Sequence, residues 1–297
     1  MCATCGCSPP THTHGPSHSH SHSHGHGHGH GPRSTVHEHE HEHEHEHEHE
    51  HEHEHEHEHE HAHPHAPSAR RTLDLERSLL AHNDRFAAAN RRFLAARDIL
   101  ALNLLSSPGS GKTTLLVETL RRLLPQRPAA VIEGDQQTSL DADRIRAAGA
   151  PAIQLNTGRG CHLEAHAVGH ALDDLASAPG LAPGSVLFIE NVGNLVCPAL
   201  FDLGEAHKVV LLSVTEGDDK PLKYPDMFAA ADLVLISKID LLPHVQFDVE
   251  RCLASARLVN PTLSALSVSA QTGAGMDAWL GWLAAARVPT AAQPPTP

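Results

Sequence analysis

Apolar residues follow two different spacings along the chain, one typical of helices and the other of buried strands. Between residues 72 and 97, large apolar residues recur every seven positions at Leu79, Phe86 and Phe93, each followed by a second apolar residue. This spacing predicts one amphipathic helix over residues 72–97. Short continuous apolar runs predict buried strands instead. Such runs lie at 99–105, 129–133, 152–155, 186–190, 208–214, 233–237 and 263–268.

Helical stretches separate most of these strand runs, and one of them is expected at 113–124. This alternation predicts an α/β fold with a mostly parallel sheet and helices on both of its faces. Residues 1–67 contain almost no large apolar side chain, so we expect them to form a largely disordered arm. The folded domain is expected to cover 68–290, and a proline-rich tail 291–297.

Charge and composition exclude several classes of protein. Of the net charge of −14, twelve glutamates and one arginine in the arm contribute −11, so the folded part has no basic excess. Because the folded part has no basic excess and only 3% of the chain's residues are aromatic, we do not expect a nucleic-acid partner. No apolar run approaches the ~18 residues that span a membrane, and no signal peptide precedes the first cysteine. We therefore expect a cytoplasmic protein whose thiols are metal ligands rather than disulfides.

The arm combines two kinds of metal ligand. Cys2, Cys5 and Cys7 lie within its first seven residues, and 24 of the chain's 30 histidines follow between His12 and His65. Three thiolates with a backbone or terminal nitrogen would suit square-planar Ni²⁺ or tetrahedral Zn²⁺. The histidines, which alternate with glutamate over 37–61, would hold further ions weakly. An affinity tag or a solvated tail is the alternative, but the preceding cysteines favour a metal reservoir.

A nucleotide-binding loop follows the first predicted strand. Residues 106–114 read Ser-Ser-Pro-Gly-Ser-Gly-Lys-Thr-Thr, a P-loop in which serine replaces the first glycine. Gly109 and Gly111 allow backbone N–H groups to converge on phosphate oxygens at a helix N-terminus. Lys112 is expected to reach the β- and γ-phosphates, and Thr113 to bind Mg²⁺.

Further segments in the order of a GTPase follow the P-loop. Glu133-Gly134-Asp135 offers a carboxylate to Mg²⁺ or to the attacking water, and Glu190-Asn191-Val192-Gly193 occupies the place of switch II. Ser237-Lys238-Ile239-Asp240 is similar to a guanine motif with serine in place of asparagine. The expected catalytic residues are Lys112, Asp135 and Glu190, with Thr113 and Asp135 as Mg²⁺ ligands. The expected nucleotide contacts are Gly109, Ser110, Gly111, Lys112, Thr113, Thr114, Gly193, Lys238, Asp240, Ser269 and Ala270.

A second group of metal-ligand residues lies inside the folded domain. Cys161 and His162 follow a glycine-rich turn, and Cys197 comes four residues after Gly193 of the switch segment. A ligand so close to a γ-phosphate sensor would couple metal binding to the nucleotide. His166 and His170 share a helix face with His162, as further ligands or as a solvated stripe.

These motifs together resemble the HypB family, the GTPases for nickel insertion into NiFe hydrogenase. The resemblance includes Cys-x-x-Cys-Gly-Cys, the histidine-rich linker, Glu-Gly-Asp-Gln-Gln-Thr, Gly-Cys-His-Leu, Glu-Asn-Val-Gly-Asn-Leu-Val-Cys-Pro and Lys-Ile-Asp-Leu-Leu-Pro. It implies a fold of the nucleotide-dependent dimerising branch of P-loop GTPases.

The resemblance also implies specific sites and partners. It places high-affinity nickel binding on Cys2, Cys5 and Cys7, and a GTP-sensitive Ni²⁺/Zn²⁺ site at a homodimer interface on Cys161, His162 and Cys197. It implies slow GTP hydrolysis that releases the metal to a HypA-type chaperone and the hydrogenase large-subunit precursor. It suggests that Lys220 or Lys223 reaches the nucleotide of the other subunit.

Three rival functions remain open. A urease-type nickel GTPase belongs to the same branch, although the amino-terminal cysteines and the Cys161-His162 pair favour hydrogenase maturation. A nickel storage or buffer protein with an uncoupled GTPase is the second, and deletion of residues 8–66 would distinguish it from a delivery protein. The third is a nucleotide-dependent switch with no delivery role, which predicts that Cys161→Ala leaves hydrogenase activity intact.

Overall fold

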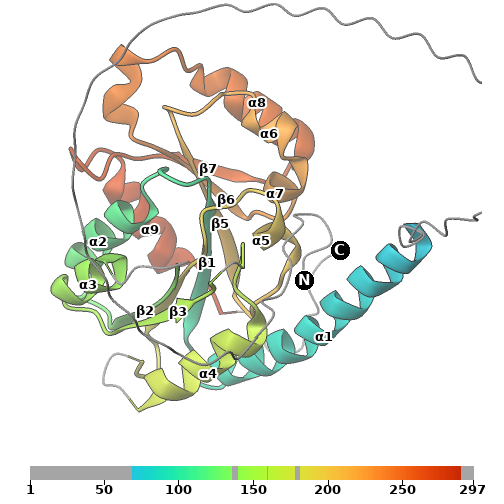
Figure 1. Cartoon of the computed structure of the whole chain (residues 1–297). Coiled ribbons are helices and arrows are strands. Elements are labelled where there is room, and N and C mark those ends of the chain that lie inside the picture. The colour runs from blue at the N-terminus through green and yellow to red at the C-terminus, as the bar shows by residue number, and fades with distance from the viewer. Residues whose placement is uncertain (1–68, 136–139, 159, 178–180, 289–297) are drawn as a thin grey trace, which may run out of the picture. The chain divides into compact units, whose positions relative to one another are not determined.

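A single seven-stranded sheet forms the centre of the domain (Figure 1). The structure is a computed structural model that describes residues 69–135, 140–158, 160–177 and 181–288. The strand order is β3-β2-β4-β1-β5-β6-β7, and all six pairings are parallel. The strands are β1 (Leu100–Ser106), β2 (Ala129–Asp135), β3 (Ala152–Asn156), β4 (Val186–Glu190), β5 (His207–Ser213), β6 (Leu233–Ser237) and β7 (Ser264–Ser267). The predicted strands and the predicted parallel α/β fold are confirmed.

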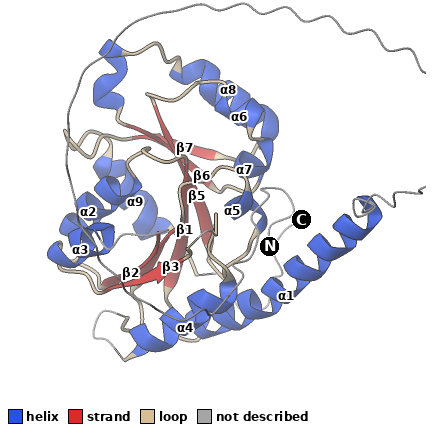
Figure 2. Cartoon of the chain, in the orientation of Figure 1, coloured by secondary structure: helices blue, strands red, loops and turns tan. Residues whose placement is uncertain are grey.

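Helices connect the strands and cover the sheet on both sides (Figure 2). None of the helices in the described part of the chain has the length and apolarity needed to cross a membrane. The longer helices are α1 (Ala69–Ala95), α2 (Lys112–Leu123), α3 (Leu140–Ala147), α4 (Ala165–Ala176), α8 (Val249–Val259) and α9 (Met276–Ala285). The shorter ones are α5 (Cys197–Leu200), α6 (Lys220–Lys223), α7 (Pro225–Ala229) and the 3-10 helix η1 (Ile239–His244).

The core has one apolar layer on each side of the sheet, because successive strand residues point to opposite faces. On one face, Leu102 and Leu104 of β1 pack with α2 and with Trp279 of α9. On the other face, Ala101 of β1 packs with α1 and α4, and Leu105 packs with α7 and α8. The residues at the carboxyl ends of the central strands are thus held from both sides.

Helix α1 is fixed to the domain by polar contacts as well as by its apolar stripe. The predicted helix is confirmed, although it ends at Ala95, before Asp98 with its left-handed φ of 51°. Asn83 and Asn90 are both 5% exposed, and they bond the backbone of segments more than seventy residues away. Arg91 adds an ion pair in which one guanidinium nitrogen donates to both carboxylate oxygens of Asp202, at 2.7 and 2.8 Å.

The arm predicted over residues 1–67, with Cys2, Cys5, Cys7 and the histidine tract, lies outside the described residues. The predicted tail over 291–297 also lies outside them. These predictions, and the proposed boundaries of the domain, remain predictions.

Candidate nucleotide and metal sites

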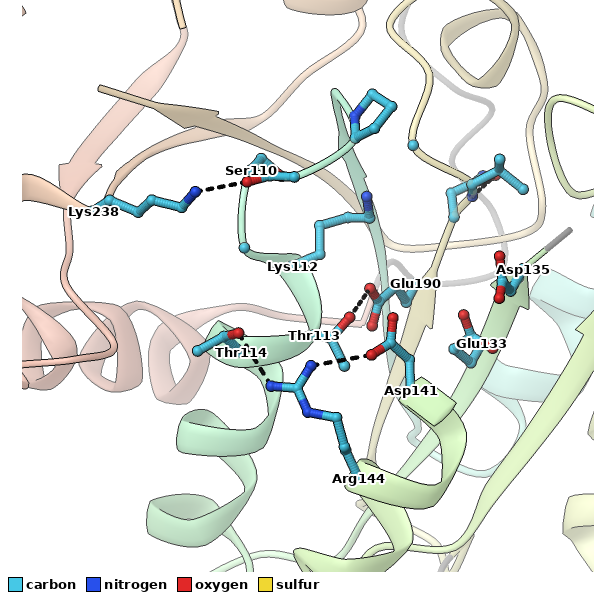
Figure 3. A pocket seen from close by; sticks show the side chains of 17 residues that line it. Ser110, Lys112, Thr113, Thr114, Glu133, Asp135, Asp141, Arg144, Glu190 and Lys238 are labelled. Carbon is cyan, nitrogen blue, oxygen red and sulfur yellow. Dashed lines mark hydrogen bonds and ion pairs between the residues drawn. The ribbon is translucent and has the colours of Figure 1, made fainter. Parts of the chain in front are cut away.

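A pocket of about 520 Å³ lies where β1, β2 and β4 end (Figure 3). Parallel strands bring their carboxyl ends to one edge, where the loops that carry chemistry meet. The P-loop between β1 and α2 forms one wall of the pocket, and the segments after β2 and β4 form the others. The lining residues are Pro108 to Thr114, Glu133 to Asp135, Asp141, Arg144, Glu190 to Gly193 and Lys238.

The P-loop has the backbone shape that its glycines predict. Gly109 and Gly111 have φ angles of 74° and 97°, a left-handed conformation that favours glycine. Lys112 Nζ and Ser110 Oγ both donate to Ser106 Oγ, at 2.7 and 2.6 Å. Burial lowers the pKa of Lys112, although Glu190 and other carboxylates oppose this shift. The lysine therefore lies in a confined site where an arriving phosphate would replace its serine partner.

A cluster of carboxylates faces the P-loop at the ends of β2 and β4. Glu190 Oε1 accepts a 2.7 Å hydrogen bond from the Thr113 hydroxyl, and Glu133 and Asp135 line the same wall (Figure 3). Burial, with added repulsion from Glu190 and Asp135, raises the pKa of Glu133 to about 8. Burial also raises the pKa of Glu190 to about 7, against the attraction of Lys112.

This donor set fits a hard divalent cation. The buried Oε2 atoms of Glu133 and Glu190 have no hydrogen-bond partner among the described residues. Uncompensated carboxylate oxygens beside a threonine hydroxyl are the ligands that Mg²⁺ prefers. Thr113, Asp135, Glu133 and Glu190 would hold such an ion, two more residues than the sequence predicted.

Asp141 and Arg144 are further pocket residues that sequence reasoning missed. Both lie on α3, where Arg144 donates to Asp141 at 3.1 Å and to the Thr114 hydroxyl at 3.2 Å. On a short helix with four charged residues, an acidic and a basic residue three positions apart are typical of a solvated pair. Only the packing of α3 beside α2 brings the pair to the pocket, so no local signal could have identified it. Glu133 was missed as a ligand because its burial depends on the fold.

A second pocket of about 230 Å³ adjoins the first. Ser237 Oγ donates to the carbonyl of Ser110 at 2.8 Å, and Lys238 Nζ donates to the carbonyl of Gly109 at 2.7 Å. The serine that departs from the guanine motif therefore ties the end of β6 to the P-loop. The pocket is lined by Ser110, Gly111, Thr114, Leu115, Ser237, Lys238, Asp240, Leu241, Val268, Ala270 and Gln271.

The acidic end of this second pocket is oriented by the following loop. The Ser269 hydroxyl donates to Asp240 Oδ1, and Ser269 itself is fully buried. A carboxylate beside an apolar slot can accept hydrogen bonds from a purine that presents two N–H donors. The structure thus brings Lys238, Asp240 and Ala270 around one cavity next to the P-loop.

Cys161, His162 and Cys197 meet in space although two chain segments supply them. Their ligand atoms all lie within 4.8 Å of one another, the only such group of three in the described part of the chain. The His162 ring packs on Phe201 with centroids 3.9 Å apart, and its Nε2 has no hydrogen-bond partner among the residues described. Burial lowers the pKa of His162, which favours the neutral, metal-binding form. Two sulfur atoms and an imidazole suit a borderline metal such as Ni²⁺ or Zn²⁺.

Other candidates lie elsewhere on the domain. His166 and His170 are exposed on α4 with their Nε2 atoms 3.1 Å apart, outside the group of three. Lys220 and Lys223 lie on α6, pair with Glu216 and Asp219 of their own segment, and do not line either pocket. Cys252 is 1% exposed, and burial, with repulsion from nearby aspartates, raises its pKa to about 12, so this thiol stays protonated near neutral pH, which is not the form that binds metals.

The comparisons with known proteins agree with this geometry. The CobW/HypB/UreG nucleotide-binding domain family matches residues 100–267. The chain is 62% identical to the hydrogenase maturation factor HypB of Rhizobium leguminosarum bv. viciae over 216 residues. This aligned region covers 73% of this chain and 71% of the relative. The HypB of Escherichia coli K12 is 62% identical over 216 residues, 73% of each chain. The crystal structure of Helicobacter pylori HypB in complex with nickel is 42% identical, with a TM-score of 0.66 over 69% of this chain and 94% of that chain.

Proposed function

The chain belongs to the HypB family of hydrogenase maturation factors, and we propose that it is a GTP-hydrolysing nickel metallochaperone. In this proposal it stores nickel and delivers it to the large-subunit precursor of NiFe hydrogenase, with a HypA-type chaperone as partner. The nickel complex of the H. pylori relative supports nickel as the cargo. GTP-controlled homodimerisation gates the metal at Cys161, His162 and Cys197.

One observation carries the proposal: a single short segment joins the nucleotide pocket to the metal ligands. Glu190 at its start bonds Thr113 of the P-loop, and Cys197 at its end is one of the three grouped ligands. Gly193, between them, lies so close to the P-loop that an added Cβ would come within 2.9 Å of Pro108 Cα. A change at the γ-phosphate position would therefore displace the backbone that carries a metal ligand.

Guanine selection rests on the second pocket. Asp240 supplies an acceptor that guanine N1–H and the N2 amine can satisfy and that adenine cannot. Lys238 bridges from this pocket to the P-loop, where its carbon stem lies 3.5 Å from the position of a Cβ at Gly111. A base seated here would place its phosphates along residues 109–114.

Hydrolysis would proceed by attack of water on the γ-phosphorus with departure of GDP. Lys112 stabilises the charge that develops on the phosphate oxygens, and Gly193 offers a backbone N–H to the γ-phosphate. In this proposal Asp135 and Glu190, which line the pocket opposite the P-loop, orient the attacking water and would hold the magnesium ion together with Thr113. A bound magnesium ion supplies further positive charge to the phosphates.

The amino-terminal cysteines have a separate role in this proposal. Cys2, Cys5 and Cys7 hold one nickel ion tightly, and the histidines that follow hold more ions weakly. The group of Cys161, His162 and Cys197 is the second metal site of this proposal, and it would take Ni²⁺ or Zn²⁺.

Nickel titration in two nucleotide states tests the proposal. The full chain is used with Cys2, Cys5 and Cys7 replaced by alanine, so that the thiolate–nickel absorption reports on Cys161 and Cys197, because the Cys252 thiol stays protonated. Metal affinity and molecular mass are measured with a non-hydrolysable GTP analogue and again with GDP. Tight nickel binding by a dimer with the analogue and weak binding with GDP is expected. Equal binding in both states would reject delivery and leave a storage protein.

A further inference from the structure

We propose that Asn194 is the positioning residue through which the bound nucleotide sets the nickel affinity of the Cys161, His162 and Cys197 site. This inference rests on the proposed function and names the regulation of that site. Asn194 lies between Gly193, which contacts the P-loop, and the turn that leads to Cys197. Its backbone contacts the P-loop, and the two ends of its side chain contact the two segments that carry the metal ligands.

On the nucleotide side, the backbone of Asn194 forms an antiparallel bridge with Ser106 at the end of β1. Ser106 is the residue whose hydroxyl accepts hydrogen bonds from Lys112 and Ser110. A phosphate that binds Lys112 removes one of these two donors from Ser106. Because Lys112 reaches the β-phosphate as well, the contact specific to a triphosphate is that of the γ-phosphate with the N–H of Gly193, the residue directly before Asn194. The backbone around Asn194 therefore has different partners with a triphosphate and with a diphosphate.

On the metal side, the Asn194 amide group holds both segments that carry ligands. Its Nδ2 donates to the carbonyl of Cys161 at 3.3 Å. Its Oδ1 accepts from the N–H of Val196 at 2.9 Å, which fixes the turn directly before Cys197. A shift of Asn194 would move these two thiolates relative to each other, and metal affinity depends on that geometry.

Asn83 of α1 makes comparable contacts with the same two segments from the side away from the nucleotide. Its Oδ1 accepts from the N–H of Ala165 at 2.9 Å, and its Nδ2 donates to the carbonyl of Asp202 at 2.7 Å. Neither end of this side chain contacts the P-loop or the segment 190–196. Asn83 therefore supports the metal site without a path to the nucleotide, which makes it a matched control.

The test compares nickel affinity in two nucleotide states for two variants. Asn194→Ser replaces the amide by a hydroxyl that can accept from Val196 but is too short to reach the Cys161 carbonyl. The isosteric Asn194→Asp, which keeps the acceptor and loses the donor, is the second variant in case the first does not fold. Both are made in the full chain with Cys2, Cys5 and Cys7 replaced by alanine, and nickel alone is the probe.

The measured quantity is the ratio of nickel dissociation constants with GDP and with the non-hydrolysable GTP analogue. We expect a ratio of roughly 5 to 100 for the parent chain, the usual range of coupling between two sites. Asn194→Ser should bring this ratio to within about twofold of one. Asn83→Ala should weaken nickel binding in both states and leave the ratio at the parent value.

Two results would overturn the inference while leaving the proposed function intact. One is a parent-like ratio in both Asn194 variants. The other is a ratio near one in Asn83→Ala as well, because any loosening of the ligand segments would then suffice. A ratio of one in the parent chain is a failure of the proposed function itself. Nucleotide affinity, measured in parallel, shows that the pocket of each variant is folded.

Discussion

The nucleotide pocket and the metal site lie on neighbouring segments of one domain but are built by opposite rules. The pocket takes one wall from seven contiguous residues, Pro108 to Thr114, and is rich in oxygen donors and charge. The metal site takes two sulfur atoms and an imidazole from segments thirty-five residues apart. Burial disfavours the charged form of the side chains in both sites, with opposite effects on the pKa. It raises the pKa of the acids Glu133 and Glu190 and lowers the pKa of the base His162.

This difference shows how one chain can hold two kinds of cation without confusing them. Clustered carboxylates select a hard ion such as Mg²⁺, whereas thiolates and neutral imidazole select Ni²⁺ or Zn²⁺. Because the two sites share no ligand, the backbone between Glu190 and Cys197 is the connection between the nucleotide pocket and the metal site. A substitution in one site should therefore strongly change the affinity of that site for its own ion. It should change the affinity of the other site only through this segment.

The largest expected effect comes from the nucleotide pocket. Lys112→Ala should lower the rate of GTP hydrolysis by at least about 100-fold, because the transition-state charge loses its buried cation. Phosphate release measured at saturating GTP checks this. Arg121→Ala, an exposed cation on the same helix, is the control, and comparable loss in that variant would contradict a specific role for Lys112.

A smaller effect is expected when a metal ligand is removed. Cys161→Ala should weaken nickel binding by at least roughly tenfold and lower hydrogenase maturation, while nucleotide affinity stays within about twofold. Nickel competition against a chelator measures the first effect. His170→Ala is the matched control, because the structure places this histidine outside the group of three. Hydrogenase activity that is intact in Cys161→Ala would point to a nucleotide switch without a delivery role.

The smallest expected effect is on the pH dependence of stability, which the two buried glutamates of the metal-free pocket should produce. Because the folded-state pKa of Glu133 and Glu190 lies above the usual 4.5, the folded chain keeps protons that the unfolded chain loses. The free energy of unfolding should therefore fall as pH rises from about 5 to about 8, and Mg²⁺ with nucleotide should flatten this dependence. Glu133→Gln should stabilise the metal-free protein at pH 8 by roughly 1–2 kcal/mol.

Urea unfolding at pH 6 and pH 8.5 measures this prediction. The exposed Glu250→Gln is the control, and its pH dependence should match that of the parent chain. A parent-like slope in Glu133→Gln would mean that the Glu133 proton does not contribute to the fall in stability.

Much of the fold could be predicted because its signals are local. Each strand is a short apolar run between helical stretches, and the P-loop is a contiguous motif that follows one of them. The short helices α5, α6 and α7 were not predicted, because four or five residues carry too little periodicity. The HypB resemblance, rather than spacing, suggested that Cys161 and Cys197 share one site.

The missed residues are those whose role depends on tertiary packing. Glu133 gains its raised pKa from burial beside another carboxylate of a different strand. Arg144 reaches the pocket only because α3 packs on α2. Asn83 is a polar residue in an otherwise ordinary helix, and Asn194 lies in the switch segment, but their contacts with Asp202 and Cys161 span thirty or more residues. No local pattern distinguishes such residues from solvated ones.

The position of β1 in the sheet also governs when the protein can first assemble during synthesis. β1 pairs with β4 and β5 but not with β2 or β3, so it has no strand partner until residues 186–190 have left the ribosome. A nascent chain that ends earlier carries the P-loop sequence on an unpaired apolar strand, a segment prone to aggregation. It also lacks Cys197, the third grouped ligand. Translation order therefore delays the metal centre of this domain until the strand that supports the nucleotide pocket has been paired.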